Sequence, residues 1–403
     1  MSLKDDVQKV RSAVDPPELS QILVDLVRAD SENPPGNEQR AAEVAAGWLE
    51  RIGCSPIEFH AEIPGRPSVI AWWPRRHSDV SEKDRILALN GHLDVVPAGD
   101  PSAWTHPPFG GDIERGRIYG RGTSDMKSGI ASMIEAVAAI ERAQLALEGT
   151  ICFQLVADEE SAGTHGTQYL VREGYIRADA AIVGEPTSLM VGIGERGALW
   201  AKIKAFGRAA HGSVPNAGVS AIEKLSRAVL ALHNRDFKKN DPLFGSPTLN
   251  VGVIAGGEKV NMVADYAEAQ IDRRLVPGEN WQSALEEIRQ ILNALTAEDP
   301  DARYEIEVMN FAEPSVESKD SRIVKVVAEC ITDCIGGPPE YYVSPGSSDA
   351  RFLRNEARIP TILFGPGIMG LAHCVDEYVE LDSMVAAAEV IAVAAHRFLS
   401  EKD

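Results

Sequence analysis

The segment from Arg85 to Pro97 combines an apolar run with two side chains that can bind or orient a metal ion. Ile86 to Leu89 is expected to form a buried strand, and His92 and Asp94 follow it two residues apart. In an extended chain this spacing places both side chains on one face. A metal-binding imidazole also needs an acceptor for its second ring N–H, which a nearby carboxylate provides. A turn whose aspartate accepts hydrogen bonds from backbone amides explains the same residues equally well.

Further residues of the metal-binding type follow other apolar runs. Strands are expected at Thr150–Ala157, Ala180–Val183 and Thr361–Phe364, and a helix at Ile130–Leu145. Strands that alternate with helices form a mostly parallel sheet, and functional side chains gather beyond the carboxyl ends of its strands. The residues expected at this edge are His92, Asp125, Glu159, Glu160, Glu185 and His373.

This set of side chains points to metal-assisted hydrolysis. Two histidines and several carboxylates suit a divalent ion such as Zn²⁺, and they outnumber the ligands of one tetrahedral site. Two ions that share a carboxylate fit better, and such pairs lie roughly 3.5–4 Å apart with a hydroxide between them. Glu159 and Glu160 offer one carboxylate for the metal and one for the proton of the water. A solvated turn or a helix N-cap is the alternative reading of this acidic pair.

Residues 195–313 have a different pattern, in which two helices alternate with four strands. The order strand–helix–strand–strand–helix–strand is that of the ferredoxin-like unit. We therefore expect an α/β protein whose mostly parallel sheet is formed by residues 1–194 and 314–403, with a ferredoxin-like domain inserted between them. The elements expected in the insert are strands at Ala198–Ala205, Thr248–Ile254, Met262–Arg273 and Tyr304–Met309, and helices at Ser220–Leu232 and Trp281–Leu295.

Composition limits the class of protein. The chain has 403 residues, of which 44% are hydrophobic and 25% charged, so there is enough apolar material for large cores. Its net charge of −20 opposes binding to nucleic acid and to anionic membranes, because both require a positive surface. We see no secretory signal, and the longest apolar stretch, Met384–Ala395, is interrupted by Glu389 and too short to span a bilayer. Five scattered cysteines are typical of reduced thiols, so we expect a cytoplasmic protein.

The stretch Gly192–Gly197 matches G-x-G-x-x-G, the pattern of dinucleotide-binding sites. That pattern must open a helix after a strand. Ala198–Ala205 alternates as a strand instead, so we interpret the glycines as a domain-junction loop, whereas a nicotinamide-dependent dehydrogenase would require a helix after Gly197. Walker, G-x-S-x-G and H-E-x-x-H motifs do not occur in the sequence, so P-loop, serine hydrolase and zincin mechanisms lose their usual markers.

Six motifs occur along the chain in a fixed order: Gly91-His-Leu-Asp-Val-Val-Pro97, Gly120-Arg-Gly-Thr-Ser-Asp125, Asp158-Glu-Glu160, Gly184-Glu-Pro186, His211-Gly-Ser-Val-Pro215 and Ala372-His-Cys-Val-Asp-Glu377. This series resembles that of one zinc amidohydrolase family, which includes acetylornithine deacetylase, succinyl-diaminopimelate desuccinylase, aminoacylase and glutamate carboxypeptidase. The resemblance runs from about Asn33 to the end of the chain and includes the inserted domain. Each motif alone is weakly specific, whereas the ordered set is strongly specific.

The resemblance implies a metal centre with two zinc ions per chain, which Co²⁺ or Mn²⁺ can replace. One ion would be held by His92, Asp125 and Glu185. The other would be held by Asp125, Glu160 and His373, so that Asp125 bridges the two ions.

The resemblance also implies roles for residues around the metals. Asp94 would orient His92, and Glu159 would be the general base and then the acid that protonates the leaving amine. The inserted domain would form a homodimer interface, and its His211 would stabilise the oxyanion in the active site of the partner chain.

Substrate contacts are implied on the inserted domain. Arg274 matches the arginine that binds the substrate carboxylate, and the adjacent Arg273 is a second candidate. Asn261 matches a residue that helps to bind substrate. Ala264 departs from the proline that the family commonly has there, which puts the local strand geometry in doubt. The family also has a motif at Ser347–Asp349, where a helix N-cap explains the residues at least as well as substrate contact.

The function expected from the resemblance is hydrolysis of the amide bond of an N-acyl amino acid, with deacetylase-like or desuccinylase-like specificity and a hydroxide between two zinc ions. A dipeptidase or carboxypeptidase of the same family is the near alternative, because both kinds of substrate place an amide next to a carboxylate. The segment Gly365–Glu380 is somewhat closer to the acetylornithine deacetylase pattern. A non-catalytic binding protein would require the loss of a ligand or of the base, and all of them are present.

Overall fold

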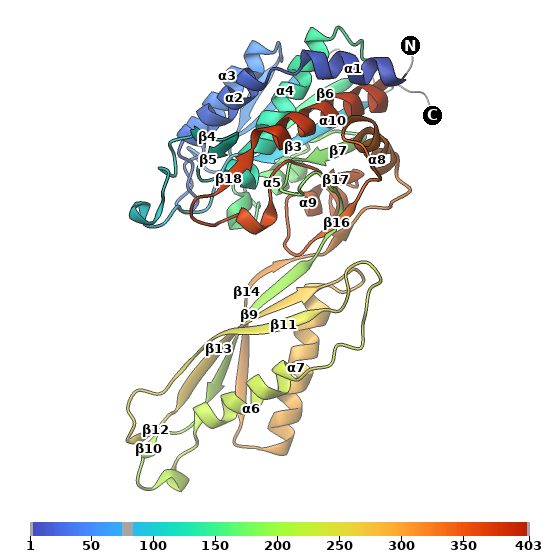
Figure 1. Cartoon of the computed structure of the whole chain (residues 1–403). Coiled ribbons are helices and arrows are strands. Elements are labelled where there is room, and N and C mark those ends of the chain that lie inside the picture. The colour runs from blue at the N-terminus through green and yellow to red at the C-terminus, as the bar shows by residue number, and fades with distance from the viewer. Residues whose placement is uncertain (1–2, 75–83, 401–403) are drawn as a thin grey trace. The chain divides into compact units, whose positions relative to one another are not determined.

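The computed structural model describes residues 3–74 and 84–400, which form two compact units (Figure 1). Unit 1 lies within Met1–Gly194, Glu317–Tyr342 and Ser348–Asp403. Unit 2 lies within Glu195–Val316 and Val343–Ser347. Unit 2 is therefore inserted, in sequence, into unit 1.

Unit 1 contains a mixed sheet with a parallel centre, which confirms the predicted mostly parallel sheet. Across the sheet the strands follow one another as β1 (Ile57–His60), β2 (Ser68–Trp73), β6 (Thr150–Val156), β3 (Ile86–His92), β7 (Ala180–Val183), β17 (Thr361–Leu363) and β8 (Val191–Glu195). Strands β6, β3, β7 and β17 are parallel, while the flanking pairs are antiparallel. A further short strand, β16, spans Tyr341–Ser344.

Helices cover both faces of this sheet, so its central strands are buried along their whole length and mostly apolar. In β3, Leu87 and Leu89 belong to the larger core on one face, while Ile86 and Ala88 pack on the other. The helices of the first face are α1 (Leu3–Ala13), α2 (Pro16–Arg28), α3 (Gln39–Arg51), α4 (Ser128–Arg142), α8 (Arg322–Cys334) and α10 (Leu381–Ser400). Those of the second face are α5 (Thr167–Arg172) and α9 (Ala350–Asn355).

Helices α4 and α10 pack together and are apolar around most of their circumference because unit 1 encloses them. By length and composition α10 could cross a membrane, but 72% of its most apolar window is buried inside the unit. Its composition is thus explained as that of a core helix.

A small second sheet in unit 1 was not indicated by the sequence. It contains β4 (Asp112–Glu114), β5 (Arg117–Tyr119) and β18 (Tyr378–Glu380), with β5 in the centre. Tyr119 pairs with Tyr378 in an antiparallel register. The segment that leads to Asp125 is thereby held beside the segment that follows His373.

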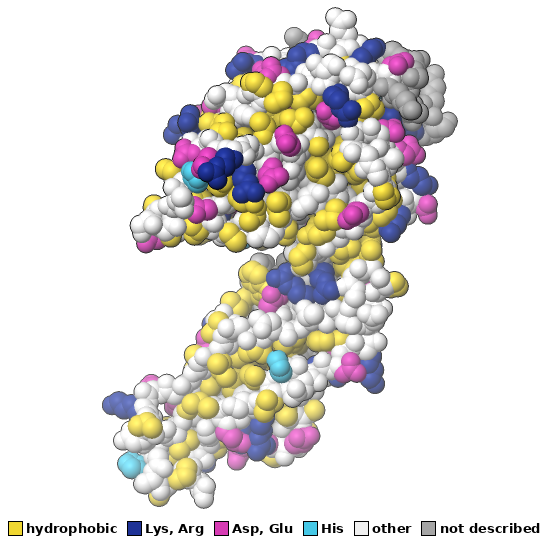
Figure 2. All heavy atoms as spheres, in the orientation of Figure 1, with side chains coloured by type: hydrophobic (Ala, Val, Ile, Leu, Met, Phe, Trp, Pro, Cys, Tyr) yellow, Lys and Arg dark blue, Asp and Glu magenta, His cyan; other side chains and the backbone are white. Residues whose placement is uncertain are grey.

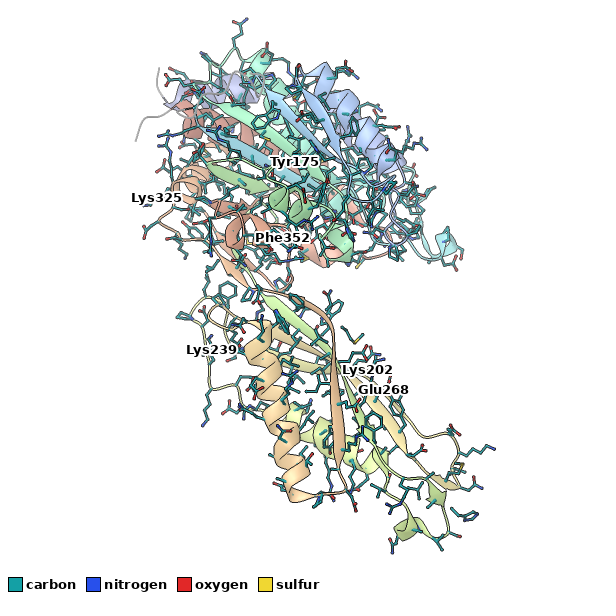
Figure 3. All side chains as sticks on the ribbon, turned by 180° about the vertical axis from the view of Figure 1, so that it is seen from behind. Tyr175, Lys202, Lys239, Glu268, Lys325 and Phe352 are labelled. Carbon is teal, nitrogen blue, oxygen red and sulfur yellow. The ribbon has the colours of Figure 1, made fainter. Side chains whose placement is uncertain are left out.

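Unit 2 is the predicted ferredoxin-like fold. Its sheet has the antiparallel order β11 (Thr248–Gly256), β13 (Tyr266–Leu275), β9 (Gly197–Phe206) and β14 (Arg303–Ala312), and one core joins it to α6 (Ala221–His233) and α7 (Trp281–Glu298). The other sheet face carries charged pairs, such as Lys202 and Glu268, whose side chains lie next to each other (Figure 3) with 3.5 Å between Nζ and Oε1. Since Gly197 begins β9, a strand follows the G-x-G-x-x-G pattern, as predicted. The interpretation of these glycines as a loop was wrong, because Gly192 and Gly194 lie within β8 and only Arg196 separates β8 from β9.

The prediction of one strand over Met262–Arg273 was wrong. Two strands occupy this region, because β12 (Met262–Val263) pairs with β10 (Ala210–His211) and β13 begins only at Tyr266. Between them the carbonyl of Ala264 accepts from the Ala221 N–H and that of Asp265 from the Gly207 N–H, which interrupts the ladder. The two-residue strand β15 (Ser315–Val316) follows β14.

Candidate metal centre

The candidate site lies at the carboxyl ends of three neighbouring parallel strands. His92 is the last residue of β3 and lies in register with Val156, the last residue of β6. Glu159 and Glu160 begin a short 3₁₀ turn just after β6, and Glu185 lies just after β7. Parallel neighbours end at the same sheet edge, which is why residues far apart in sequence meet here.

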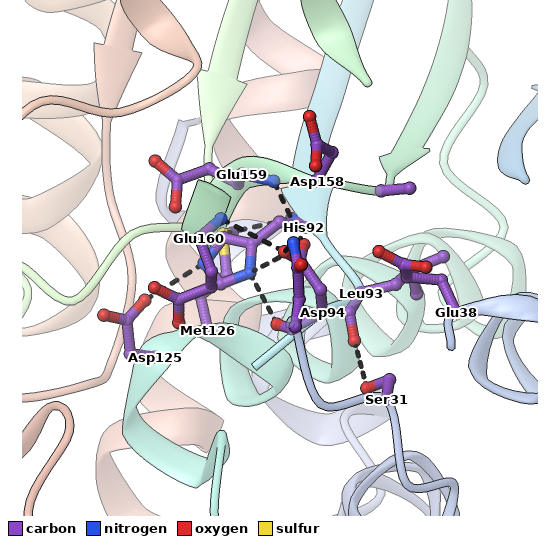
Figure 4. A network of polar contacts seen from close by, with 12 residues as sticks. Ser31, Glu38, His92, Leu93, Asp94, Asp125, Met126, Asp158, Glu159 and Glu160 are labelled. Atoms are coloured by element: carbon purple, nitrogen blue, oxygen red, sulfur yellow. Dashed lines mark hydrogen bonds and ion pairs between the residues drawn. The ribbon is translucent and has the colours of Figure 1, made fainter. Parts of the chain in front are cut away.

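Asp125 lies between two imidazole rings. Its Oδ1 is 3.1 Å from Nε2 of His92, and its Oδ2 is 3.5 Å from Nε2 of His373. The same His373 nitrogen is 3.2 Å from Oε2 of Glu160. Ligand atoms of His92, Asp125 and Glu160 all lie within 4.8 Å of one another (Figure 4). One carboxylate thus offers an oxygen to each of two histidines, as a ligand shared by two ions would.

The donor set fits divalent cations. Imidazole nitrogens and carboxylate oxygens are the ligands that Zn²⁺ takes in hydrolytic sites. Glu160 Oε1 is buried and has no hydrogen-bond partner among the described residues. A buried carboxylate oxygen without a partner is costly unless a cation binds it.

Asp94 approaches His92 with its backbone rather than with its side chain. Nδ1 of His92 is 2.8 Å from the Asp94 carbonyl oxygen and 3.7 Å from Asp94 Oδ1. A ring N–H that donates to this carbonyl leaves Nε2 free to face Asp125. The Asp94 carboxylate accepts the backbone N–H groups of Glu159 and Glu160 at 3.2 and 3.1 Å (Figure 4).

Negative charge is concentrated at this sheet edge. Burial raises the pKa of Glu159 well above its ordinary value, and Glu185 and Glu160 raise it further against the attraction of His92. Burial and the charge of Asp125 likewise raise the pKa of Glu185. Burial alone would lower the pKa of His92, but Asp125 and the other carboxylates raise it well above its ordinary value. Divalent cations would relieve this excess of carboxylates.

Other polar residues, which the sequence did not indicate, hold the turn at Asp158–Ser161 in place. The side-chain amide of Asn33 donates to Asp94 Oδ2 at 2.8 Å, and its oxygen accepts from the Ser161 hydroxyl at 2.9 Å. Arg66 pairs with Glu38 and, at 3.0 Å, with Asp158. The sequence Asn33-Pro-Pro-Gly indicates a loop, but it does not indicate that Asn33 contacts Asp94 and Ser161.

Close packing of glycines brings Glu185 to the site. A Cβ atom on Gly129, in the first turn of α4, would lie 2.1 Å from the carbonyl oxygen of Gly184. A side chain at Gly129 would therefore push the start of α4 away from the segment that carries Glu185.

Three predicted residues belong to unit 2. His211 in β10 and Asn261 are exposed, and Nδ1 of His211 lies 2.7 Å from the Ser213 hydroxyl. Arg274 pairs with Asp272 at 2.9 Å and lines a cavity of about 430 Å³ in this unit together with Arg196 and Thr248.

Arg273 and Arg274 differ in accessibility. Arg273 is 1% exposed and pairs with Glu279 and Glu287 at 2.7 and 3.3 Å. Its guanidinium is thus buried in unit 2 and already paired with these two glutamates. Of the two, Arg274 is the arginine that a substrate could reach.

Asp349 does not cap α9 with its side chain. The Ser348 hydroxyl oxygen accepts the Ala350 N–H at 3.2 Å instead. Asp349 Oδ2 accepts from the Thr167 hydroxyl at 2.8 Å, and burial raises the pKa of Asp349 to about 7. The N-cap reading of this motif therefore applies to the serine and not to the aspartate.

Comparison with known proteins finds the family that the six motifs resemble. Residues 88–397 match the model of peptidase family M20/M25/M40. Succinyl-diaminopimelate desuccinylase from Paracoccus denitrificans is 30% identical over 392 residues, which is 93% of this chain and 96% of that protein. The enzyme of the same name from Cereibacter sphaeroides is 31% identical over 376 residues, covering 89% of this chain and 93% of that protein.

Solved structures share the fold. Aminopeptidase PepT from Bacillus cereus superposes with a TM-score of 0.77 at 22% identity, covering 95% of this chain and 99% of that one. The di-peptidase Dug1p from Saccharomyces cerevisiae superposes with a TM-score of 0.79 at 14% identity, covering 100% of this chain and 99% of that one. At these identities the likeness concerns the fold alone.

Proposed function

The chain belongs to peptidase family M20/M25/M40, and on that basis we propose that it hydrolyses the amide bond of an N-acyl amino acid with the help of two zinc ions. The observation that carries this proposal is the carboxylate of Asp125 between His92 and His373. In the proposed centre His92, Asp125 and Glu185 hold one ion. Asp125, Glu160 and His373 hold the other.

When bound, a pair of divalent ions makes water acidic enough to attack at neutral pH and polarises the carbonyl of the amide. The residues of the chain position the groups around that reaction. Glu159 takes the proton of the attacking water and returns it to the leaving amine. The Asp94 carboxylate accepts the backbone N–H of Glu159 and so holds the turn that carries this side chain.

We assign residues 195–313, which lie in unit 2, to a lid and dimerisation domain, and unit 1 to the catalytic domain. The pairing surface is formed by edge strand β11 and helix α6. Val253 and Ile254 on β11 and Leu230 on α6 are exposed, and Figure 2 shows hydrophobic side chains at the surface of unit 2. Apolar side chains beside an unpaired strand edge favour pairing with a second copy. In the dimer His211 stabilises the oxyanion in the partner's site.

The proposed substrate is a small anion. Because the chain has a net charge of −20, a carboxylate substrate needs local cations, which Arg274 and Arg196 supply around the cavity in unit 2. The desuccinylase relatives favour a succinyl group, whose free carboxylate distinguishes it from acetyl. A dipeptidase or carboxypeptidase remains the alternative, since Arg274 would bind a peptide carboxylate equally well.

We place the protein in the cytoplasm. Its cysteines are free, and Cys54, Cys152, Cys330 and Cys334 are buried, as expected where thiols remain reduced.

A hydrolysis screen tests the proposal. The zinc-loaded protein is incubated with N-succinyl, N-acetyl and N-formyl amino acids and with dipeptides, and the amine released is measured. We expect the N-acyl amino acids to be cleaved, with the metal-depleted protein inactive. Cleavage of dipeptides alone would favour the peptidase, and turnover that survives metal removal would contradict the proposed chemistry.

A further inference from the structure

Glu377 is a buried carboxylate that holds the turn carrying Asp125. Its side chain is 1% exposed. Oε1 accepts the backbone N–H groups of Ser124 and Asp125 at 2.7 and 3.0 Å. Oε2 accepts the N–H of Gly122 at 3.1 Å and the guanidinium of Arg121 at 2.6 Å. One side chain therefore sets the direction of this turn just before the shared ligand.

Arg121 extends the same contact to the segment that carries His373. Its side chain is 3% exposed. Besides Glu377, it donates to the backbone carbonyl of Cys374 at 3.1 Å and to that of His373 at 3.4 Å. Its charge also lies 5.1 Å from the centre of the Trp104 ring. The ion pair thus contacts the backbone of the turn that carries Asp125 and the backbone of the segment that carries His373.

Neighbouring contacts hold the His373 segment from its outer side. The Asp376 carboxylate accepts the Thr105 N–H at 2.7 Å and the Thr105 hydroxyl at 2.8 Å. On the inner side, the Ser124 hydroxyl accepts the Ile368 N–H at 2.7 Å. Two ligand-bearing segments more than 240 residues apart are joined by side-chain to backbone bonds.

General stabilisation of unit 1 is a weak explanation for this arrangement. A buried ion pair often adds little to stability, because removing two charges from water costs about as much as their attraction returns. The contacts of Arg121 and Glu377 are instead directed at the backbone of Gly122, Ser124, Asp125 and His373. Groups that orient metal ligands in this way typically contribute about 10- to 100-fold in metal affinity or activity.

We propose that Arg121 and Glu377 are positioning residues, which hold Asp125 and His373 at the separation needed to bind one divalent ion between them. This inference rests on the proposed function, because it concerns the metal centre of that reaction.

Two variants separate positioning from stability. In Glu377→Gln one carboxylate oxygen remains as the amide oxygen and the other is replaced by an NH₂ group. Whichever way the amide turns, the two groups that donated to the lost oxygen have no acceptor. These two groups belong either to Ser124 and Asp125 or to Gly122 and Arg121. Arg121→Lys keeps the charge facing Glu377, but a single ammonium group does not reproduce the planar fork that also reaches the two carbonyls.

Glu135→Gln is the matched control. Glu135 is also a fully buried carboxylate, and it accepts the Asp15 N–H at 2.7 Å and pairs with Arg142. These partners lie outside the candidate metal centre. The control therefore makes the same chemical change at a buried carboxylate that pairs with a more exposed arginine, without touching a ligand-bearing segment.

The measurement is stepwise zinc affinity of the metal-depleted proteins, by competition with a chromophoric chelator, together with the unfolding free energy of each metal-free protein. We expect Glu377→Gln and Arg121→Lys to weaken at least one zinc site by about 10- to 100-fold. Glu135→Gln should bind zinc like the wild type, whatever it does to stability. The double variant should lose less affinity than the two single losses combined, because both break one unit.

The inference is overturned if Glu377→Gln and Arg121→Lys bind both zinc ions as tightly as the wild type. Should Glu377→Gln fail to fold, Arg121→Lys decides by the same criterion. A wild-type protein that binds no zinc would contradict the proposed function itself and remove the inference with it. Wild-type zinc binding with unaffected variants would contradict the inference alone.

Discussion

His92 and Asp94 meet through the backbone of the aspartate: Nδ1 of His92 lies 2.8 Å from the Asp94 carbonyl oxygen, while the nearest carboxylate oxygen is 3.7 Å away. The carboxylate is directed at the turn that carries the acidic pair. Asp94 therefore has two separable tasks, one performed by its backbone and one by its side chain.

Replacement of Asp94 by asparagine separates these tasks. The carbonyl that faces His92 remains, but one carboxylate acceptor becomes a donor that faces a backbone N–H of the Glu159–Glu160 turn. We expect zinc content to be nearly retained and kcat to fall by about 10- to 100-fold, as for other groups that orient a site. Metal analysis and steady-state kinetics check this. A variant that loses zinc but keeps its turnover per bound zinc pair would show that the side chain serves His92 instead.

Replacement of Glu159 by glutamine removes the proposed base. Glutamine has nearly the same size but cannot take a proton, so zinc should remain bound while kcat falls by about 10²- to 10⁴-fold. Zinc content and initial rates with the best N-acyl amino acid measure the two effects. Near-normal turnover in this variant would refute the assignment of the base.

His211 is expected to act across a dimer interface. Replacement by alanine removes an oxyanion donor and should lower kcat by about 10²- to 10³-fold. Mixed dimers of His211→Ala and Glu159→Gln chains should regain activity, because the site with the intact base receives His211 from the other chain. Rates of co-expressed, separately tagged chains test this. Mixed dimers no more active than the two parents would place His211 in the site of its own chain.

Glu135 should make stability depend on pH. Burial raises its pKa from 4.5 to about 7, against the attraction of Arg142. Because the folded-state pKa lies above the unfolded one, the folded form is favoured most below pH 4.5, and this contribution is lost as the pH rises through about 7. Glutamine does not titrate. Chemical unfolding of the metal-free proteins between pH 5 and 8 should therefore show the wild type losing stability relative to Glu135→Gln. A constant difference would show that Glu135 titrates normally.

The main elements of the catalytic sheet could be predicted from the sequence because buried parallel strands are short, continuous apolar runs. Strand β7 has the predicted bounds, Ala180–Val183. The candidate ligands could be located because each follows such a run or opens a helix. Ala264 put the local strand geometry in doubt, but the break itself could not be predicted, since it depends on hydrogen bonds from Gly207 and Ala221, which are distant in sequence.

The roles of Arg121 and Glu377 could not be predicted either, because they too depend on contacts between segments distant in sequence. Strands β4, β5 and β18 have three residues each, too few for a periodic pattern, and β18 pairs with a segment far away in the chain. The tasks of Arg121 and Glu377 depend on that pairing. Both residues lie within the six motifs, but the motifs gave them no role, and only the fold reveals that both are buried.

Anomalous X-ray diffraction at the zinc absorption edge, from crystals grown with zinc, tests the proposed two-zinc centre most directly. We predict two peaks beside the Asp125 carboxylate, one also bound by His92 and Glu185 and the other by Glu160 and His373. Peaks elsewhere, or none beside Asp125, would contradict the account.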